Sequence, residues 1–218
     1  MKKILFLLIT ASITLMGCAP SAPQEKTENA VIEAIMARRS IRQYHATPVG
    51  RDTLMQIMTC GINAANGQNK QSWEVRVVDN PELLEAMKEA MAKGHPNMDP
   101  AMVKGCFRGA PTMVFIARSK SYDFSAYDCG LLAENMVLSA WSMGIGSICL
   151  GSPVRFLTDN DVCKPLVEKL GFSEGYQLCL CVGLGYADEA PEAKPRNKEK
   201  TECIRICRKG CARKSISW

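Results

Sequence analysis

The stretch from Pro111 to Ala117 (PTMVFIA) is an unbroken apolar run, and it restricts the fold of this chain more than any other segment. A strand without a polar face is typical of a sheet interior, where other elements cover both of its faces. We therefore expect 111–117 to be a central strand. Apolar patterns of strand type predict three further strands, at 73–79, 147–150 and 176–184.

Helical patterns alternate with these strands. The spacing of apolar residues, with proline and glycine at the ends, predicts five helices, at 29–38, 54–65, 80–94, 126–143 and 158–170. Thr27 or Asn29 is the expected N-cap of the first helix, and Thr158 is that of the last. A chain of 218 residues with this alternation predicts one layered α/β or α+β domain.

Residues 1–17 have the layout of a secretory signal peptide, because two lysines precede the apolar run 4–9 and small residues follow it. The sequence Leu-Met-Gly-Cys at 15–18 resembles the lipobox of bacterial lipoproteins, in which the cysteine becomes the acylated first residue. The alternative is a plain signal peptide with a chance cysteine. We expect lipidation at Cys18, a flexible tether over 18–28, and a location in the cell envelope, on the periplasmic side of a bacterial membrane.

The net charge is small but the basic residues are clustered. Without the two lysines of the signal peptide, 25 Lys and Arg face 22 Asp and Glu, which predicts no nucleic-acid partner. One basic cluster, RRSIR at 38–42, follows the first helix, and a second, KPR at 194–196, lies near the C-terminus. Guanidinium groups suit phosphate oxygens. The simpler alternative is that these side chains are solvated and interact favourably with the negative end of the helix dipole.

Two loops between these clusters carry glycine, namely AANGQNKQSW at 64–73 and GIGSICLGS at 144–152. Glycine lets backbone amides approach a flat ring or a phosphate. In chain order, RRSIR, the Asn-x-Gln-x-Trp loop, GIGSICLG, GLGY and KPR resemble the nitroreductase-like family of FMN-dependent oxidoreductases. The resemblance covers residues 30 to about 200. It implies an α+β fold with a central, mostly antiparallel sheet flanked by helices, in which 29–218 form one domain.

The resemblance also implies a homodimer of interlocked subunits with FMN at the interface. The first basic cluster would meet the FMN phosphate and the polar edge of the flavin. The 64–73 loop would lie against the flavin, partly from the other subunit, the 144–152 loop would lie beside the ring, and the late basic pair would complete the phosphate site. In that order the residues are Arg38, Arg39, Ser40 and Arg42; Asn66, Gly67, Asn69 and Gln71; Cys149, Leu150 and Gly151; and Lys194 and Arg196.

Two positions depart from the family pattern. Ser72 stands where a proline usually precedes the tryptophan, and Ala65-Asn66 stands where Pro-Ser is usual. Both departures concern the geometry of the 64–73 loop and leave its polar side chains in place.

The implied activity is two-electron reduction of nitroaromatics, quinones or similar electron-poor molecules by NAD(P)H, in a ping-pong mechanism. No protein nucleophile is expected, since the hydride moves to and from the flavin. Two alternatives stay open: a flavin-binding envelope lipoprotein without nicotinamide-dependent turnover, and a relative that performs reductive dehalogenation or flavin destruction. NAD(P)H is not expected outside the cytoplasm, so a functional lipobox leaves the electron donor open.

The C-terminal tail contains Cys203, Cys207 and Cys211 among basic residues. A spacing of four would place the three thiols on one helix face. A disulfide and free thiols are both compatible with this pattern. No metal site is predicted, because the tail lacks the close Cys-x-x-Cys pairs of zinc and iron–sulfur sites.

Overall fold

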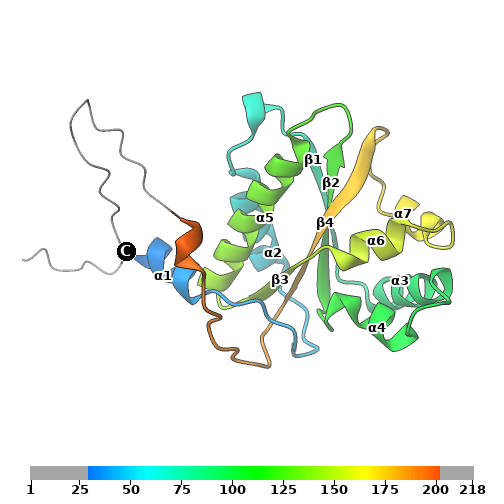
Figure 1. The fold of residues 1–218 in the computed structure, drawn as a ribbon, viewed down its shortest axis with the longest axis horizontal. Coiled ribbons are helices and arrows are strands. Elements are labelled where there is room, and N and C mark those ends of the chain that lie inside the picture. Colours follow the sequence, from blue (N-terminus) through cyan, green and yellow to red (C-terminus); the bar gives the residue numbers. More distant parts are fainter. Residues whose placement is uncertain (1–28, 202–218) are drawn as a thin grey trace, which may run out of the picture.

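The structure is a computed structural model that describes residues 29–201 (Figure 1). The predicted signal peptide, the tether, the lipidation site Cys18 and the three tail cysteines Cys203, Cys207 and Cys211 all lie outside the described residues. Four strands form one antiparallel sheet in the order β1-β2-β4-β3. Their bounds are Trp73–Val78 for β1, Thr112–Ser119 for β2, Gly146–Leu150 for β3 and Tyr176–Gly185 for β4. The predicted antiparallel α+β fold is confirmed.

Strand β2 occupies the interior of the sheet, as its apolar run predicts. It pairs with β1 on one side and β4 on the other, and residues 112–117 are all buried. Met113 and Phe115 belong to the core on one face of the sheet, whereas Val114 and Ile116 belong to the core on the other. Because side chains alternate along a strand, one apolar run supplies both cores.

Helices cover both faces of this sheet (Figure 1). On one face lie α2 (Arg51–Ile62) and the long α5 (Ser125–Ser142); on the other lie α3 (Pro81–Gly94), α4 (Pro100–Lys104), α6 (Ser152–Thr158) and α7 (Lys164–Glu168). Helices α2 and α5 approach closely at Gly61, where a Cβ atom would lie 2.6 Å from Cγ of Met136. A larger residue at this position would require the Met136 side chain or the helices to move.

Helix α1 (Ala30–Ala37) begins at Asn29, one of the two predicted caps. The Asn29 side chain accepts hydrogen bonds from the backbone N–H groups of Val31 and Ile32, at 3.1 and 3.2 Å. The helix buries no residue, and its apolar side chains Val31, Ile32, Ile35 and Met36 are between 53% and 71% exposed. The apolar face of α1 is therefore uncovered within one chain.

The predicted helix at 158–170 is wrong in its start and length, because only the short helix α7 (Lys164–Glu168) lies within that range. Thr158 is the last residue of α6, and its hydroxyl donates to the carbonyl of Val154 at 2.8 Å instead of capping a new helix. Helix α6 begins at Ser152 with Pro153 in its first turn, and Pro165 lies in the first turn of the separate helix α7. Proline lacks the N–H that a continuous helix needs at that point, so the chain forms two short helices.

Helix α3 begins after its cap Asn80 and ends at Gly94, as the sequence predicts, with His95 as the C-cap. The apolar side chains of Leu132, Met136 and Val137 on α5 are buried, whereas that of Leu131 is 49% exposed. Within residues 29–201, no helix is both long enough and apolar enough to cross a membrane.

Candidate functional site

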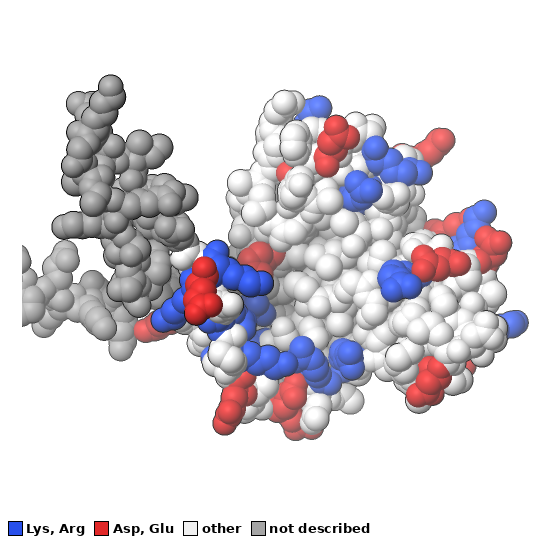
Figure 2. Space-filling model, in the orientation of Figure 1, with Lys and Arg blue, Asp and Glu red and all other residues white. Residues whose placement is uncertain are grey.

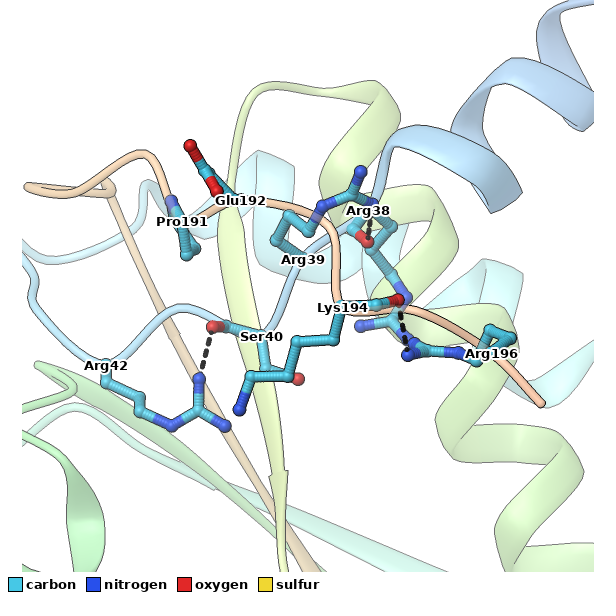
Figure 3. Close-up of a pocket in the computed structure, with 8 residues that line it drawn as sticks. All are labelled: Arg38, Arg39, Ser40, Arg42, Pro191, Glu192, Lys194 and Arg196. Carbon is cyan, nitrogen blue, oxygen red and sulfur yellow. Dashed lines mark hydrogen bonds between the residues drawn. The ribbon is translucent and has the colours of Figure 1, made fainter.

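The two basic clusters, about 150 positions apart in sequence, line one cavity. Its volume is about 100 Å³, and Figure 3 shows its walls. The lining residues are Arg38, Arg39, Ser40, Arg42, Pro191, Glu192, Lys194 and Arg196. Five of these side chains are cationic and one is a carboxylate. We call this hollow the basic cavity. Figure 2 shows Lys and Arg atoms gathered around α1 and the segment that follows it.

The sheet holds the first basic cluster in place. Ser40 forms a parallel bridge with Ser147 of β3, and the Ile41 N–H donates to the Ser147 carbonyl at 3.0 Å. The Ile41 side chain is fully buried and anchors the segment. Tyr44 pairs with Ala187, just beyond β4. Strands β3 and β4 pair with each other. The segment after α1 pairs with β3, and the segment that follows β4 continues to residues 191–196, so both segments reach the cavity.

The guanidinium groups are oriented by backbone carbonyls. Arg39 donates from Nη1 to the carbonyls of Met36 and Arg38, both at 2.8 Å. Arg42 donates to the Ser40 carbonyl at 2.8 Å, and Arg196 donates to the Lys194 carbonyl at 3.1 Å (Figure 3). A guanidinium has five N–H donors. These contacts use one edge of each group and leave the others for an anion.

Carboxylates balance part of this charge. Arg38 lies 3.8 Å from Glu134 of α5, and the backbone N–H of Arg42 donates to the Glu189 carboxylate. Glu192 lines the cavity itself. Positive charge still predominates, and an anion is the ligand that such a site favours.

The polar loop, residues 66–71, includes the short 3₁₀ helix η1 (Gly67–Asn69). Three of its non-glycine residues, Gln68, Asn69 and Gln71, have left-handed φ values of 55°, 52° and 48°. Residues other than glycine seldom adopt the left-handed region, so contacts with other parts of the chain must stabilise this loop conformation. Asn66 contributes one such contact, because its Oδ1 accepts from the Gln71 N–H at 2.9 Å.

Asp128, a buried residue of α5, anchors the polar loop. Its Oδ1 accepts from the Gly67 N–H at 3.0 Å, and its Oδ2 accepts from the Ser72 hydroxyl at 2.6 Å. Ser72 is itself buried. At the position where the family usually has proline, this chain therefore supplies a hydroxyl that ties the loop to α5.

Tyr122 packs against the same loop. A Cβ atom on Gly67 would lie 2.0 Å from the Tyr122 hydroxyl oxygen, so only glycine fits there without movement. The Lys70 ammonium lies 4.6 Å from the centre of the Tyr122 ring, at cation–π distance. The conformation of the polar loop thus depends on residues near the start of α5.

The third predicted segment lies at the end of β3. Cys149 is exposed, Leu150 is buried, and Gly151 precedes α6. Ser147, two residues before Cys149 on β3, pairs with Ser40 of the basic cavity, so β3 runs beside this cavity.

The predicted polar loop residues do not line the basic cavity. Asp128, which holds Gly67, and Glu134, which meets Arg38, are six positions apart on α5. That separation corresponds to about 9 Å along a helix. Within one chain the structure therefore brings together the two basic clusters and the β3 end, and it keeps Asn66, Gly67, Asn69 and Gln71 apart from them. Whether these residues bind a ligand stays a prediction.

Sequence reasoning missed several residues of this region. Asp128 and Tyr122 hold the polar loop, Glu134 and Glu189 contact arginines, and Pro191 and Glu192 line the cavity. One signal was available for Asp128, since an aspartate within an apolar helical segment requires a buried partner. Within residues 29–201 no group of three or more His, Cys, Asp or Glu side chains is placed to hold a metal ion.

The nitroreductase family model matches residues 35–186, which is more than half of the chain. The chain therefore belongs to the nitroreductase family, a family of oxidoreductases. It is 32% identical to a protein of Archaeoglobus fulgidus provisionally named an NADH dehydrogenase/NAD(P)H nitroreductase, over 71% of this chain and 84% of that protein. It is 29% identical to the NADPH-flavin oxidoreductase of Vibrio harveyi, over 77% of this chain and 70% of that one.

The structural likeness agrees. A nitroreductase of Desulfitobacterium hafniense, solved with bound FMN, superimposes with a TM-score of 0.74. It is 28% identical in sequence, and the match covers 81% of this chain and 99% of that one. The order of strands and helices that forms the basic cavity thus belongs to a fold that holds FMN in that relative.

Proposed function

We propose that this chain is an FMN-dependent oxidoreductase that takes electrons from NAD(P)H and reduces small electron-poor molecules such as nitroaromatics and quinones. The observation that carries the proposal is the basic cavity, where two clusters far apart in sequence place five cations beside the end of β3. An anionic group of a ligand with a planar part fits this arrangement. The nitroreductase of D. hafniense with bound FMN supports the choice of ligand.

The size of the cavity suits the phosphate of FMN. A volume of about 100 Å³ is too small for a flavin ring, since pockets for cofactors usually enclose ~300–1,000 Å³. Arg38, Arg39, Arg42, Lys194 and Arg196 would hold the phosphate and the polar edge of the flavin. The ring itself would lie outside the cavity, along the backbone of Cys149, Leu150 and Gly151.

We further propose that a second copy of the chain completes the site. Besides the apolar residues of α1, others are exposed on α2 and from the N-cap of α5 into its first two turns, namely Met55, Ile62, Phe124, Tyr127 and Leu131. Faces of this kind mark protein contacts. In a homodimer the polar loop of one subunit could reach the flavin on the other, which accounts for its separation from the basic cavity within one chain.

In this proposal the protein residues bind and orient, and bound FMN supplies the hydride chemistry. A guanidinium near the N1–C2=O edge would stabilise the negative charge of reduced flavin. The polar loop would contribute amide groups, and its attachment to Asp128 would fix their position. Donor and acceptor would use the same flavin face in turn, which predicts ping-pong kinetics.

The alternative chemistries receive less support from the fold. The resemblance to the family implies that relatives often carry a substrate lid at positions that correspond to segment 94–109. In this chain the segment contains α4 and the 3₁₀ helix η2 (Gly105–Phe107). Val103, Cys106 and Phe107 of this segment are buried in the core, so it packs beneath the sheet and is no large lid. Dehalogenation and flavin destruction therefore rank below simple reduction.

The sequence of residues 1–18 supports a further proposal about location. We propose that the chain is exported, lipid-anchored at Cys18 and held on the periplasmic side of a bacterial membrane. NAD(P)H is not expected at that location. The alternative function is therefore that of a lipoprotein that binds flavin without nicotinamide-dependent turnover. Palmitate labelling that is lost in Cys18→Ala would support the anchor, and labelling that persists would contradict it.

The absorption spectrum of the purified protein tests the central proposal. We expect a yellow protein with flavin bands that are bleached by anaerobic NADPH and restored by a quinone or a nitroaromatic. Flavin that NADPH does not bleach would favour the binding lipoprotein. Colourless protein that fails to take up added FMN would contradict both functions.

A further inference from the structure

A second cavity lies beside the basic cavity and has a volume of about 300 Å³. The end of α1, the Trp141 side chain of α5 and residues of the segment 187–191, which follows β4, line this cavity. Arg39 and Pro191 line both cavities, so the two hollows are neighbours with a common wall. We call the second hollow the tryptophan cavity.

Alternation along the segment after α1 explains why two cavities form there. Ser40 bridges to Ser147 of β3, so the backbone is extended at this point. Successive side chains of an extended backbone point to opposite sides. Positions 38, 40 and 42 line the basic cavity, positions 37 and 41 line the tryptophan cavity, and Arg39 contributes to both. A ligand that passes Arg39 can therefore occupy the two cavities together.

Most of the wall of the tryptophan cavity is apolar. Trp141 is the aromatic residue of this wall, and Ala37, Ile41 and Ala187 are among the aliphatic ones. Apolar and aromatic walls with a few polar groups are usual in sites for small molecules, which enclose ~300–1,000 Å³. The tryptophan cavity reaches the lower end of that range, so it has room for one ring system.

Two charged side chains, Arg39 and Glu189, complete the tryptophan cavity. Arg39 donates to the carbonyls of Met36 and Arg38 through Nη1, and none of its hydrogen bonds within residues 29–201 uses Nη2 or Nε. Glu189 accepts from the Arg42 N–H through Oε1, and its Oε2 has no hydrogen bond among the described residues. The cavity thus offers donors to an anion and an acceptor to an N–H group.

We propose that the tryptophan cavity binds the adenine of FAD, so that this chain accepts FAD as well as FMN. The inference rests on the proposed function, because it places the phosphate next to the flavin in the basic cavity. FAD is FMN extended by AMP through a pyrophosphate. The second phosphate lies beside Arg39, the adenine stacks on Trp141, and its exocyclic amine donates to Oε2 of Glu189.

Adenine matches this lining in shape and in charge. Its flat ring suits the indole of Trp141, since aromatic rings stack on one another. Its amine is a donor, which suits the carboxylate of Glu189, whereas a ring with an anionic substituent would be repelled there. The cations of the basic cavity compensate the charge of the pyrophosphate.

Titration of the full-length protein, freed of flavin, with FMN and with FAD tests the inference. We expect FAD to bind at least as tightly as FMN, because both phosphates meet cations and the adenine adds a stacking contact. FAD that binds more than about tenfold more weakly than FMN would overturn the inference and leave the proposed function intact. Binding of neither flavin would overturn the proposed function, and the inference with it.

Variants of Trp141 test the position of the adenine. Trp141→Leu removes the ring and should lower the affinity for FAD roughly tenfold, with the affinity for FMN unchanged. Trp141→Phe keeps an aromatic ring and should keep most of the affinity for FAD, which separates stacking from any loss of folding. Equal effects of Trp141→Leu on both flavins, or no effect on either, would overturn the adenine assignment.

Glu189→Gln and Glu192→Gln form a matched pair. Each removes one negative charge beside the cations, but only Glu189 lines the tryptophan cavity. Glutamine has one acceptor oxygen, which the Arg42 N–H uses, so none is left for the adenine amine. The ratio of FAD affinity to FMN affinity should fall roughly tenfold in Glu189→Gln and stay unchanged in Glu192→Gln. The same ratio in both variants would contradict the placement of adenine in this cavity.

Discussion

The Ser72 hydroxyl donates a 2.6 Å hydrogen bond to the carboxylate of Asp128, and both side chains are buried. The same carboxylate holds the backbone of Gly67. One acidic group on α5 therefore fixes both ends of a loop that contains three left-handed residues. This relationship explains how the chain keeps a defined polar loop with serine at the position usually taken by proline.

Replacing Asp128 by asparagine should loosen the polar loop. Asparagine has only one acceptor oxygen, so one of the two hydrogen bonds is lost and a buried donor stays unpaired, at a cost of about 1–3 kcal/mol. We expect lower stability to urea and weaker FMN binding. Asp123→Asn, at an exposed acid five residues earlier, is the control. Equal stability of the two variants would contradict the anchoring role.

Removing cations from the basic cavity should weaken FMN binding without unfolding the protein. Arg38→Ala and Arg196→Ala each delete charge-assisted hydrogen bonds worth about 1.5–3 kcal/mol, which corresponds to a loss of affinity of roughly 10- to 100-fold. Flavin fluorescence titration measures the affinity. Arg155→Ala, an arginine 81% exposed on α6, serves as the control. Unchanged affinity in both cavity variants would refute the phosphate assignment.

Gly67→Ala should displace the polar loop through a clash with Tyr122. The added methyl group would lie 2.0 Å from the phenol oxygen, and overpacking of this kind costs about 1–3 kcal/mol. Removing the hydroxyl by Tyr122→Phe should restore part of the lost stability in the double variant. Thermal unfolding of the single and double variants tests this coupling, and simple additivity of the two effects would show that the contact is absent.

A charge on the exposed face of α1 should dissociate the proposed homodimer. Ile32→Glu puts a carboxylate into an apolar contact, where an unpaired charge is strongly unfavourable. Sedimentation equilibrium should show a monomer that has also lost flavin. Lys93→Glu, on α3 of the opposite layer, should stay dimeric. A monomeric unmodified protein with full flavin content would rule out the shared site.

Stability should fall at acid pH partly through Glu74 of β1. Burial alone would raise its pKa, but hydrogen bonds from Ser173 and the charge and hydrogen bond of Arg76 lower the pKa below its ordinary value of 4.5. A lowered pKa in the folded state stabilises the protein above the unfolded pKa, and this contribution is lost as the pH falls through the folded value. Urea unfolding at pH 7 and pH 3 should therefore show a smaller difference in Glu74→Gln than in exposed Glu174→Gln.

Much of the fold could be predicted because local patterns decided it. The apolar run of β2 has no polar face, so only the sheet interior suits it, and Asn29 offers the side-chain acceptor that begins α1. The error at Thr158 has a local cause too, since a threonine can cap a helix or bond backwards to the carbonyl four residues earlier. Pro165 would lie in the interior of a helix that starts at Thr158, where proline is unfavourable, so a separate helix begins at Lys164 instead.

The site was harder to predict because it depends on contacts between distant residues. Asp128 and Gly67 are 61 positions apart, and nothing in either segment points to the other. The meeting of the two basic clusters follows from the pairing of β3 with β4, whereas spacing along the chain says nothing about it. The apolar face of α1 was visible in the sequence, but periodicity cannot tell whether the same chain or a second copy covers it.

Ser40 and Ile41 pair with Ser147 of β3, which is the outermost strand on that side of the sheet. An open outer strand offers unpaired amides to any other extended chain and promotes aggregation. The segment that presents arginines to the cavity therefore also shields the protein against edge-to-edge polymerisation. A protein without residues 38–44 would lose the arginines of the cavity and the cover of β3 at Ser147 together, and we expect it to aggregate.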